Sequence, residues 1–244
     1  MVGADPEFFI FDEGRPIPAV MVLESPIVMK GIGYIQADGI QFECNPIPDK
    51  AEALTEKITA LLERAKEFGE VVFAPTIKVE KKIIAMAGAF NSSSLQFGCS
   101  PDLSIYGERA SYRGSAIGIP YRFAGAHIHI DAPPEAIKVL DRILGLVINE
   151  QVPNVNGDNI IGGVEGEALR RQYYGRAGIY RKKEYGSEWR VPSSAILNDF
   201  GKYLKVAEIL SENWEKYDKF PLSEEETKNV INSGLTYPEA WNYI

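Results

Sequence analysis

The chain has 244 residues, 45% of them hydrophobic and 25% charged, which is the composition of a folded globular protein and argues against a largely disordered one. Its 26 basic and 34 acidic residues give a formal net charge of -8. Sequence-independent binding of nucleic acid rests on a basic surface, so we expect no nucleic-acid partner.

The N-terminal sequence MVGADPEFFIFDEG places acids on both sides of a short apolar run, unlike a signal peptide, and no apolar run reaches membrane-spanning length. Cys44 and Cys99 are too few for a disulfide framework and lack the paired spacing of zinc ligands. These features predict a cytoplasmic protein without a membrane partner. The length favours one domain over residues 1–244, with a helical C-terminal portion from about residue 198.

The first part of the chain predicts strands followed by a helix. Residues 6–14 (PEFFIFDEG) are rich in aromatic and β-branched residues before a turn, and residues 33–46 read as two strands joined by an Ala-Asp-Gly turn. From 49 to 68, apolar residues recur at spacings of three and four, and Gly69 follows. This spacing predicts an amphipathic helix.

The middle of the chain predicts further strands and a second helix. Residues 71–80 and 81–90 look strand-like, and 95–121 are rich in loop residues. Residues 122–132 (RFAGAHIHIDA) predict one strand. Residues 133–151 begin with two prolines and continue with helical spacing of apolar residues, which predicts a helix.

The last third contains a Gly-, Asn- and Arg-rich segment and predicts a short strand and helices. Residues 151–187 are rich in Gly, Asn and Arg, and 187–194 (SEWRVPSS) predict a short strand. The remainder, from about residue 198, predicts helices, with the sequence SEEE at 223–226 as a capping box.

Four predicted strands carry two polar residues spaced by two. Residues at this spacing project from the same face of a strand. Each pair taken singly has a structural interpretation, such as a solvated turn or an exposed strand face. Together they predict one charged concave face, because acids, both histidines of the chain and an arginine interrupt otherwise apolar strands. The pairs are Asp5 and Glu7, Gln41 and Glu43, His127 and His129, and Glu188 and Arg190.

Carboxylates that share a cavity need cations to stay ionised, so a divalent metal ion is the expected partner. Acid-rich sites suit Mg²⁺ or Mn²⁺. Two histidines are too few for cupin-type sites and for metallo-hydrolases that use further histidines. An iron site with both histidines and Asp131 or another acid stays open, but it leaves the other acids unexplained. Several Mg²⁺ ions beside arginines are typical of phosphoryl transfer, although the chain has no Walker A sequence.

The motifs GADPEFF, ADGIQFECNP, FGCSPD, RFAGAHIHI and RAGIYRKKEYGSEWR occur in this order over residues 3–190. They resemble the active-site strands of the glutamine synthetase and glutamate-cysteine ligase superfamily, and more closely the small phage-type carboxylate-amine ligases. The resemblance implies an α+β fold, in which a curved antiparallel sheet lines the active site and helices pack on its outer face. We expect the predicted helices at 49–68 and 133–149 to cover the back of this sheet.

The resemblance also implies a metal site and a neighbouring contact to substrate. His129 would contact the substrate or a phosphate group. One acid differs from the superfamily pattern, since Asp5 stands where glutamine synthetases have Glu. The implied metal ligands are Asp5, Glu7, Glu43, His127 and Glu188.

The remaining roles implied by the resemblance belong mostly to arginines. Arg190 would stabilise charge on the transferred phosphoryl group. Arg122, Arg176 and Arg181 would bind the substrate carboxylate or the ATP phosphates, because a guanidinium group matches both geometrically. Asp38, at the Ala-Asp-Gly turn, is a weaker candidate for the same site.

The resulting hypothesis is an ATP-dependent carboxylate-amine ligase with ATP and Mg²⁺ (or Mn²⁺) as cofactors. Its partners would be a small-molecule or peptide carboxylate and an amine, and the oligomeric state is left open. One alternative is a guanidino-type kinase of the same superfamily. The other is a nucleotide- or metal-binding module without turnover.

Overall fold

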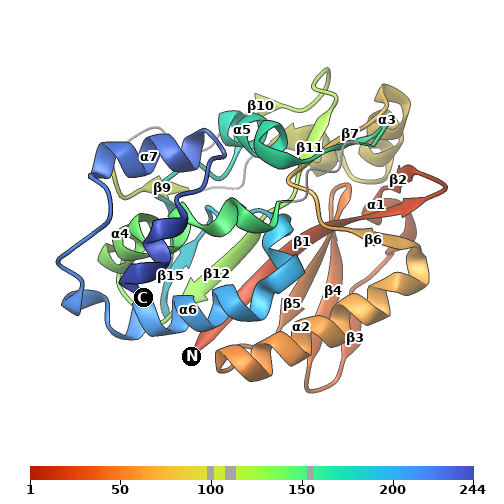
Figure 1. The fold of residues 1–244 in the computed structure, drawn as a ribbon. Helices are drawn as coiled ribbons and strands as arrows, with labels where there is room; N and C mark the ends of the chain where they lie inside the picture. The colour runs from red at the N-terminus through yellow and green to blue at the C-terminus, as the bar shows by residue number, and fades with distance from the viewer. Residues whose placement is uncertain (98–101, 108–113, 153–156) are drawn as a thin grey trace.

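The computed structural model describes residues 1–97, 102–107, 114–152 and 157–244 (Figure 1). Cys99 lies outside the described residues, whereas Cys44 is a buried free thiol. Among the described residues, no helix is both long and apolar enough to cross a membrane.

The fold is α+β, as predicted, and its centre is a large antiparallel sheet. Within the described residues this sheet has ten strands in the order β3-β4-β5-β1-β12-β15-β14-β9, with β2 and β6 also paired to β1. The ten are β1 (Val2–Asp12), β2 (Arg15–Ile17), β3 (Ile27–Met29), β4 (Gly33–Asp38), β5 (Gln41–Pro46), β6 (Glu70–Val72), β9 (Leu103–Ser104), β12 (Ala126–Ile130), β14 (Ile179–Lys183) and β15 (Gly186–Trp189).

Two smaller sheets and the helices complete the described structure. The smaller sheets contain β7 (Thr76–Lys78), β11 (Tyr121–Phe123) and β13 (Ile160–Ile161), and β8 (Gln96–Phe97) and β10 (Gly114–Ser115). The α-helices are α1 (Ala19–Val22), α2 (Ala51–Ala65), α3 (Lys81–Phe90), α4 (Glu135–Arg142), α5 (Gly163–Tyr173), α6 (Phe200–Glu212) and α7 (Glu224–Asn232). Short 3-10 helices span Lys66–Phe68, Ser92–Leu95, Leu144–Leu146, Ile148–Gln151, Ser194–Asp199, Trp214–Lys216 and Pro238–Tyr243.

One face of the central sheet is apolar and carries the helices. Phe8 pairs with Phe42 between β1 and β5, and Ile128 pairs with Trp189 between β12 and β15. These four side chains are fully buried in one core cluster with Leu54 of α2. Because side chains alternate along a strand, the residues between them face the other side. Helices α2 and α6 run alongside this sheet in Figure 1, and α4 contacts β15. The two helices predicted to cover the back therefore pack as expected.

The predicted hairpin and the predicted capping box are both confirmed. Strands β4 and β5 pair from Gly33 opposite Pro46 to Asp38 opposite Gln41. Gly39 takes the left-handed φ of 65° that this tight turn requires. At the start of α7, Ser223 and Glu226 exchange the reciprocal hydrogen bonds of a capping box.

The prediction of a strand over 81–90 is wrong, since these residues form helix α3. Ile84 and Ala87 are its buried residues, at the helical spacing of three, and they pack in a second core cluster with Ile77. The two adjacent isoleucines favour a strand locally. Burial of one helical face outweighs that preference. The preceding strand is also divided, into β6 and β7, on either side of Pro75.

The prediction of one strand over 122–132 is wrong as well, because the chain changes sheets at Gly125. Strand β11 pairs with β7, whereas β12 pairs with β1. The Gly125 amide donates to Glu7 Oε2 at 2.7 Å, and its carbonyl accepts the Glu7 amide at 2.8 Å. A Cβ at Gly125 would lie 2.5 Å from His127 Nε2. This glycine therefore brings Glu7 and His127 to one place.

We expect Gly125→Ala to lower the free energy of unfolding by about 1–3 kcal/mol, because the added methyl group overlaps the buried His127 ring. Urea denaturation measures the change. Gly157→Ala is the matched control, since the nearest atoms to its Cβ are at 4.0 Å. Equal stabilities of the two variants would contradict the steric argument.

Two other segments differ from prediction. The helix expected over 133–151 ends at Arg142, and the remainder forms two 3-10 turns. The Gly-, Asn- and Arg-rich segment 151–187, for which the sequence predicts no element, contains α5 and β14. Helix α5 buries Arg170 and Arg171, so its buried face is charged and shows no apolar stripe in the sequence.

Candidate active site

The face of the central sheet opposite the helices carries a continuous row of polar residues. Asp5 of β1 lies opposite His127 of β12, and His129 lies opposite Glu188 of β15. On the other side of β1, Glu7 lies opposite Glu43 of β5. The register thus brings all four predicted pairs to one face of the sheet.

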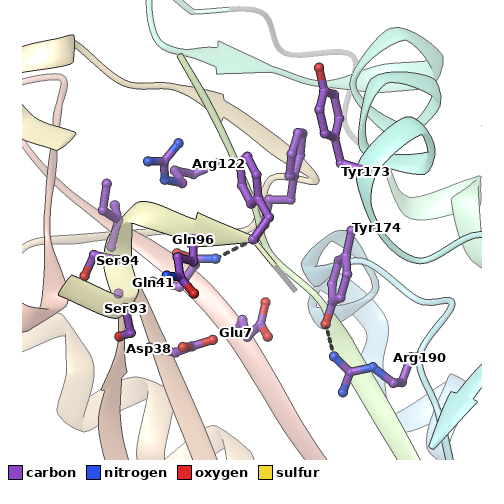
Figure 2. A pocket seen from close by; sticks show the side chains of 14 residues that line it. Glu7, Asp38, Gln41, Ser93, Ser94, Gln96, Arg122, Tyr173, Tyr174 and Arg190 are labelled. Carbon is purple, nitrogen blue, oxygen red and sulfur yellow. Dashed lines mark hydrogen bonds between the residues drawn. The ribbon is translucent and has the colours of Figure 1, made fainter. Parts of the chain in front are cut away.

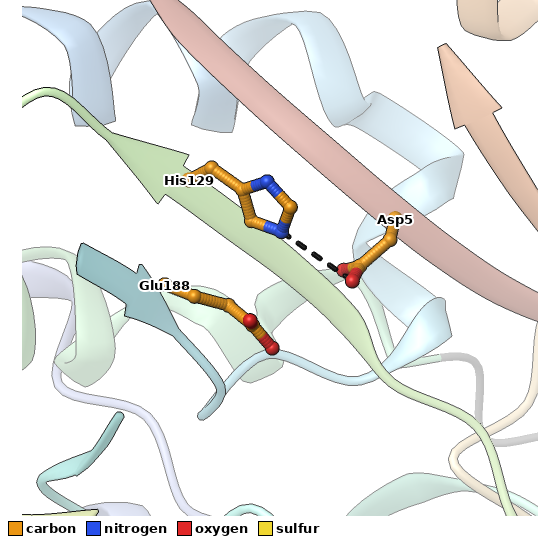
Figure 3. A group of neighbouring side chains, drawn as sticks. All are labelled: Asp5, His129 and Glu188. Atoms are coloured by element: carbon orange, nitrogen blue, oxygen red, sulfur yellow. Dashed lines mark ion pairs between the residues drawn. The ribbon is translucent and has the colours of Figure 1, made fainter. Parts of the chain in front are cut away.

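Asp5, His129 and Glu188 form an acid–imidazole group on this face (Figure 3). Their potential ligand atoms all lie within 4.8 Å of one another. His129 Nε2 is 3.3 Å from Asp5 Oδ2. Carboxylate oxygens and an imidazole nitrogen at this spacing fit Mg²⁺ or Mn²⁺.

The two histidines differ in their surroundings. His127 is 2% exposed, with Nδ1 2.9 Å from Asp5 Oδ1 and Nε2 in contact with the Tyr174 hydroxyl. His129 is more open, and its Nδ1 is 2.9 Å from the Tyr185 hydroxyl. The sequence predicts His127 as the metal ligand and His129 as the substrate contact, and both roles stay predictions. The geometry favours His129 as ligand, because the group of potential ligand atoms within 4.8 Å of one another contains His129 together with Asp5 and Glu188.

Charges around this group keep its acids ionised. Burial alone would raise the pKa of Asp5, but the two imidazoles lower it below the usual range of an aspartate. Burial opposes ionisation of Glu188 as well, yet His127 and Arg190 bring its pKa to about 2. Burial and the Arg190 charge lower the pKa of His127. Ionised carboxylates are the forms that bind metal ions.

Arg190, Arg181 and Lys183 form a cluster of cations next to the acid–imidazole group. Arg190 Nη1 contacts Glu188 Oε1, and Arg190 Nε is 3.0 Å from Asp102 Oδ1. Lys183 Nζ lies 2.7 Å from Glu188 Oε2, and Arg181 Nη1 lies 3.5 Å from the same oxygen. Strands β14 and β15 therefore present cations next to the proposed metal ligands, an arrangement that suits a phosphate chain.

The opposite side of the site is acidic. Burial, followed by the charge of Asp38, raises the pKa of Glu7 well above its ordinary value. Burial and the charges of Asp5 and Asp38 raise the pKa of Glu43 to about 8. Glu43 accepts a hydrogen bond from Gln36 at 3.1 Å. No ion pair to Glu7 or Glu43 is found among the described residues, so a bound cation would favour the ionised form of both.

A pocket of about 200 Å³ opens between this acidic side and Arg190 (Figure 2). In Figure 2, Arg190 and Tyr174 lie on one side of the pocket, and Arg122 and Ser94 lie on the other. Glu7 and Asp38 lie between these two sides. Further lining residues are Gly39, Ile40, Gln41, Ser93, Gln96, Phe97, Phe123 and Tyr173. The pocket is thus continuous with the polar face of the sheet, because Glu7 and Arg190 belong to both.

The other two predicted substrate arginines lie elsewhere. Arg181 sits beside Glu188 and Asp102, next to the acid–imidazole group. Arg176 follows α5 and is absent from the described lining of the pocket. Their roles stay predictions.

Sequence reasoning missed several residues of this site. The Tyr174 hydroxyl accepts a hydrogen bond from Arg190 Nη2 at 2.8 Å and also contacts His127. Asp102 holds Arg190 and Arg181, and Lys183 holds Glu188. The alternation of β14 contained a signal for Lys183, which is two residues from Arg181. Tyr174 follows no strand pattern, whereas Asp102 ends the motif FGCSPD, which belongs to the resemblance.

Comparison with known protein families gives a match for this chain. Residues 111–234 match the family model described as Phage phiEco32-like COOH.NH2 ligase-type 2. The match covers just over half of the chain and contains His127, His129, Glu188 and Arg190, whereas Asp5 lies before it. No curated protein and no solved structure matches the chain.

Proposed function

The chain belongs to the phage phiEco32-like COOH.NH2 ligase-type 2 family, and from this premise we propose that it joins a carboxylate to an amine in a reaction that consumes ATP. As a member of this family it is an amide-forming ligase. The proposed substrates are a small-molecule or peptide carboxylate and an amine, with ATP and Mg²⁺ (or Mn²⁺) as cofactors.

The reaction would take two steps. An oxygen of the substrate carboxylate attacks the γ-phosphorus of ATP, the bond to ADP breaks, and an acyl phosphate forms. The amine nitrogen then attacks the acyl carbon, inorganic phosphate leaves, and the amine loses a proton to give a neutral amide. No side chain acts as nucleophile, so the residues contribute positioning and charge stabilisation.

The acid–imidazole group carries this proposal, because it places potential metal ligands within 4.8 Å of one another and next to Arg190. The proposed ligands are Asp5, Glu7, Glu43, Glu188 and one of the two histidines. A divalent ion held there would offset negative charge on the ATP phosphates.

Arg190, Arg181 and Asp38 complete the proposed site. Arg190 would donate hydrogen bonds to the transferred phosphoryl group, with Asp102 and Tyr174 fixing its orientation. Arg181 and Arg176 would bind phosphate or carboxylate groups, Asp38 would contact substrate at the rim of the pocket, and His129 would contact phosphate if His127 binds the metal. We also propose that the polar face of the sheet curves around the substrates.

Product analysis tests the proposed function. The protein is incubated with ATP, Mg²⁺, hydroxylamine as the amine and a panel of carboxylic acids, and ADP, phosphate and hydroxamate are measured. We expect equal amounts of all three products, and no turnover after removal of Mg²⁺ with a chelator. A stable phosphorylated product without free phosphate would instead indicate a kinase and contradict the ligase reaction.

A further inference from the structure

Arg122 is a buried cation that has no acidic partner in the described part of the chain. Its side chain is 3% exposed. Its Nη1 donates to the carbonyls of Ile119 at 3.0 Å and Tyr121 at 2.7 Å, and its guanidinium lies 5.2 Å from the centre of the Phe97 ring. These contacts fix the guanidinium plane and leave its positive charge uncompensated.

Arg170, Arg171 and Arg190 are also buried, and each of them contacts an acid. Arg170 and Arg171 both contact Glu167, and Arg190 contacts Glu188 and Asp102. For Arg122, burial lowers the pKa to about 10 and no neighbouring acid opposes that shift. A buried charge without a counter-charge is costly, and an anionic ligand would remove the cost.

Ser94 supplies a second unpartnered group in the same pocket. It is 6% exposed, and its hydroxyl has no hydrogen-bond partner among the described residues. Arg122 Nη2 likewise lacks a partner in that part of the structure. Buried polar atoms are normally hydrogen-bonded, so two unpartnered atoms lining one pocket indicate a missing ligand. A carboxylate can accept from a guanidinium and from a hydroxyl at once.

The position of these groups separates them from the reacting centre. In Figure 2, Arg122 and Ser94 lie on one side of the pocket and Arg190 lies on the other. At about 200 Å³ the pocket is smaller than the roughly 300–1,000 Å³ of typical drug-sized ligand sites, so it suits one small acid and not ATP. The phosphate chain is better matched to the cations beside Glu188.

We propose that Arg122 and Ser94 bind a second, non-reacting carboxylate of the acid substrate, so that the enzyme selects dicarboxylic acids. This inference rests on the proposed ligase function, in which the first carboxylate is converted to the amide. Glu7 and Asp38 also line the pocket, and their charges oppose an anion. Glu7 belongs to the proposed metal ligands, whose ion would offset its charge, and the positive charge of Arg190 partly offsets that of Asp38.

Binding of glutarate and butyrate tests this subsite without requiring turnover. The two acids have similar length and differ in the second carboxylate. Affinities are measured by ligand-detected NMR or calorimetry in the presence of Mg²⁺, for the wild type, Arg122→Gln and Ser94→Ala. The matched control is Arg142→Gln, because Arg142 also stacks on an aromatic ring, Phe220, and donates to a carbonyl, outside the pocket.

We expect the wild type and Arg142→Gln to bind glutarate at least tenfold more tightly than butyrate. Arg122→Gln should lose this preference, and Ser94→Ala should reduce it. Equal binding of the two acids by the wild type, binding of neither, or an unchanged preference in Arg122→Gln would overturn the proposal. Inorganic phosphate that displaces glutarate and binds more tightly, in a manner that depends on Arg122, would also overturn the proposal. The subsite would then serve a phosphoryl group.

The same acids in the hydroxamate assay separate this inference from the proposed function. Selective binding of glutarate without ADP or hydroxamate would leave the subsite standing and contradict the ligase reaction. Hydroxamate formation without selectivity between dicarboxylic and monocarboxylic acids would support the ligase reaction and contradict the subsite.

Discussion

Glu188→Gln should lower the rate of ATP-dependent amide formation by about 10²–10³-fold or more, because one side chain serves both the proposed metal site and Arg190. The carboxylate contacts Arg190 through Oε1 and Lys183 through Oε2, at 2.7 Å for the latter. A glutamine keeps the volume but carries no charge, and its amide nitrogen cannot accept from a cation or bind a metal ion. The rate of hydroxamate formation measures the loss.

Glu184→Gln is the matched control, since Glu184 is exposed at the turn of the same β14–β15 hairpin. It should retain activity. Thermal unfolding of both variants shows whether the fold is kept, and the similar shape of glutamine makes this the expected result for Glu188→Gln. Full activity in a folded Glu188→Gln protein would remove Glu188 from the active site.

Arg171→Met should lower the free energy of unfolding by about 3–5 kcal/mol, because it leaves a buried acid without its main partner. Arg171 Nη2 is 3.0 Å from Glu167 Oε2, and neither side chain is more than 2% exposed. Arg171 also donates to the carbonyls of Gly175 and Val191. Val191 directly follows Arg190, so the same contact holds the chain after β15 against α5.

Urea denaturation measures this effect, with Arg64→Met as the control. Arg64 pairs with Glu67 on the surface of α2, where the two side chains are 38% and 61% exposed. Surface pairs of this kind contribute about 0–1 kcal/mol. If both variants lost equally little stability, the buried pair would not hold α5 to the chain after β15.

The strands that carry Asp5, His127 and Glu188 were predictable because their alternation is a local property. Asp5, His127 and Glu188 each occupy strands whose intervening residues are apolar, and that pattern fixes which side chains share a face. Antiparallel pairing then brings the three to one place. The resemblance to carboxylate-amine ligases is confirmed by the family match over residues 111–234.

Local sequence patterns failed where the buried side chains are charged and where the chain passes from one sheet to another. Helix α5 was missed because its buried positions include Glu167, Arg170 and Arg171, which in a sequence look like a solvated surface. The break at Gly125 was missed because a single glycine in a strand-like run is also compatible with an uninterrupted strand. In both cases the decisive contacts are with residues far away in the chain.

The sequence by itself determined that polar residues alternate with apolar ones in β1, β5, β12 and β15, because this pattern depends on a spacing of two residues. Only the tertiary structure decided which imidazole lies in the acid–imidazole group, that Tyr174 and Asp102 hold Arg190, and that Arg122 is buried without an acid. These features depend on long-range pairing and on exclusion of water. Both are properties of the packed chain, and neither is encoded in a local pattern.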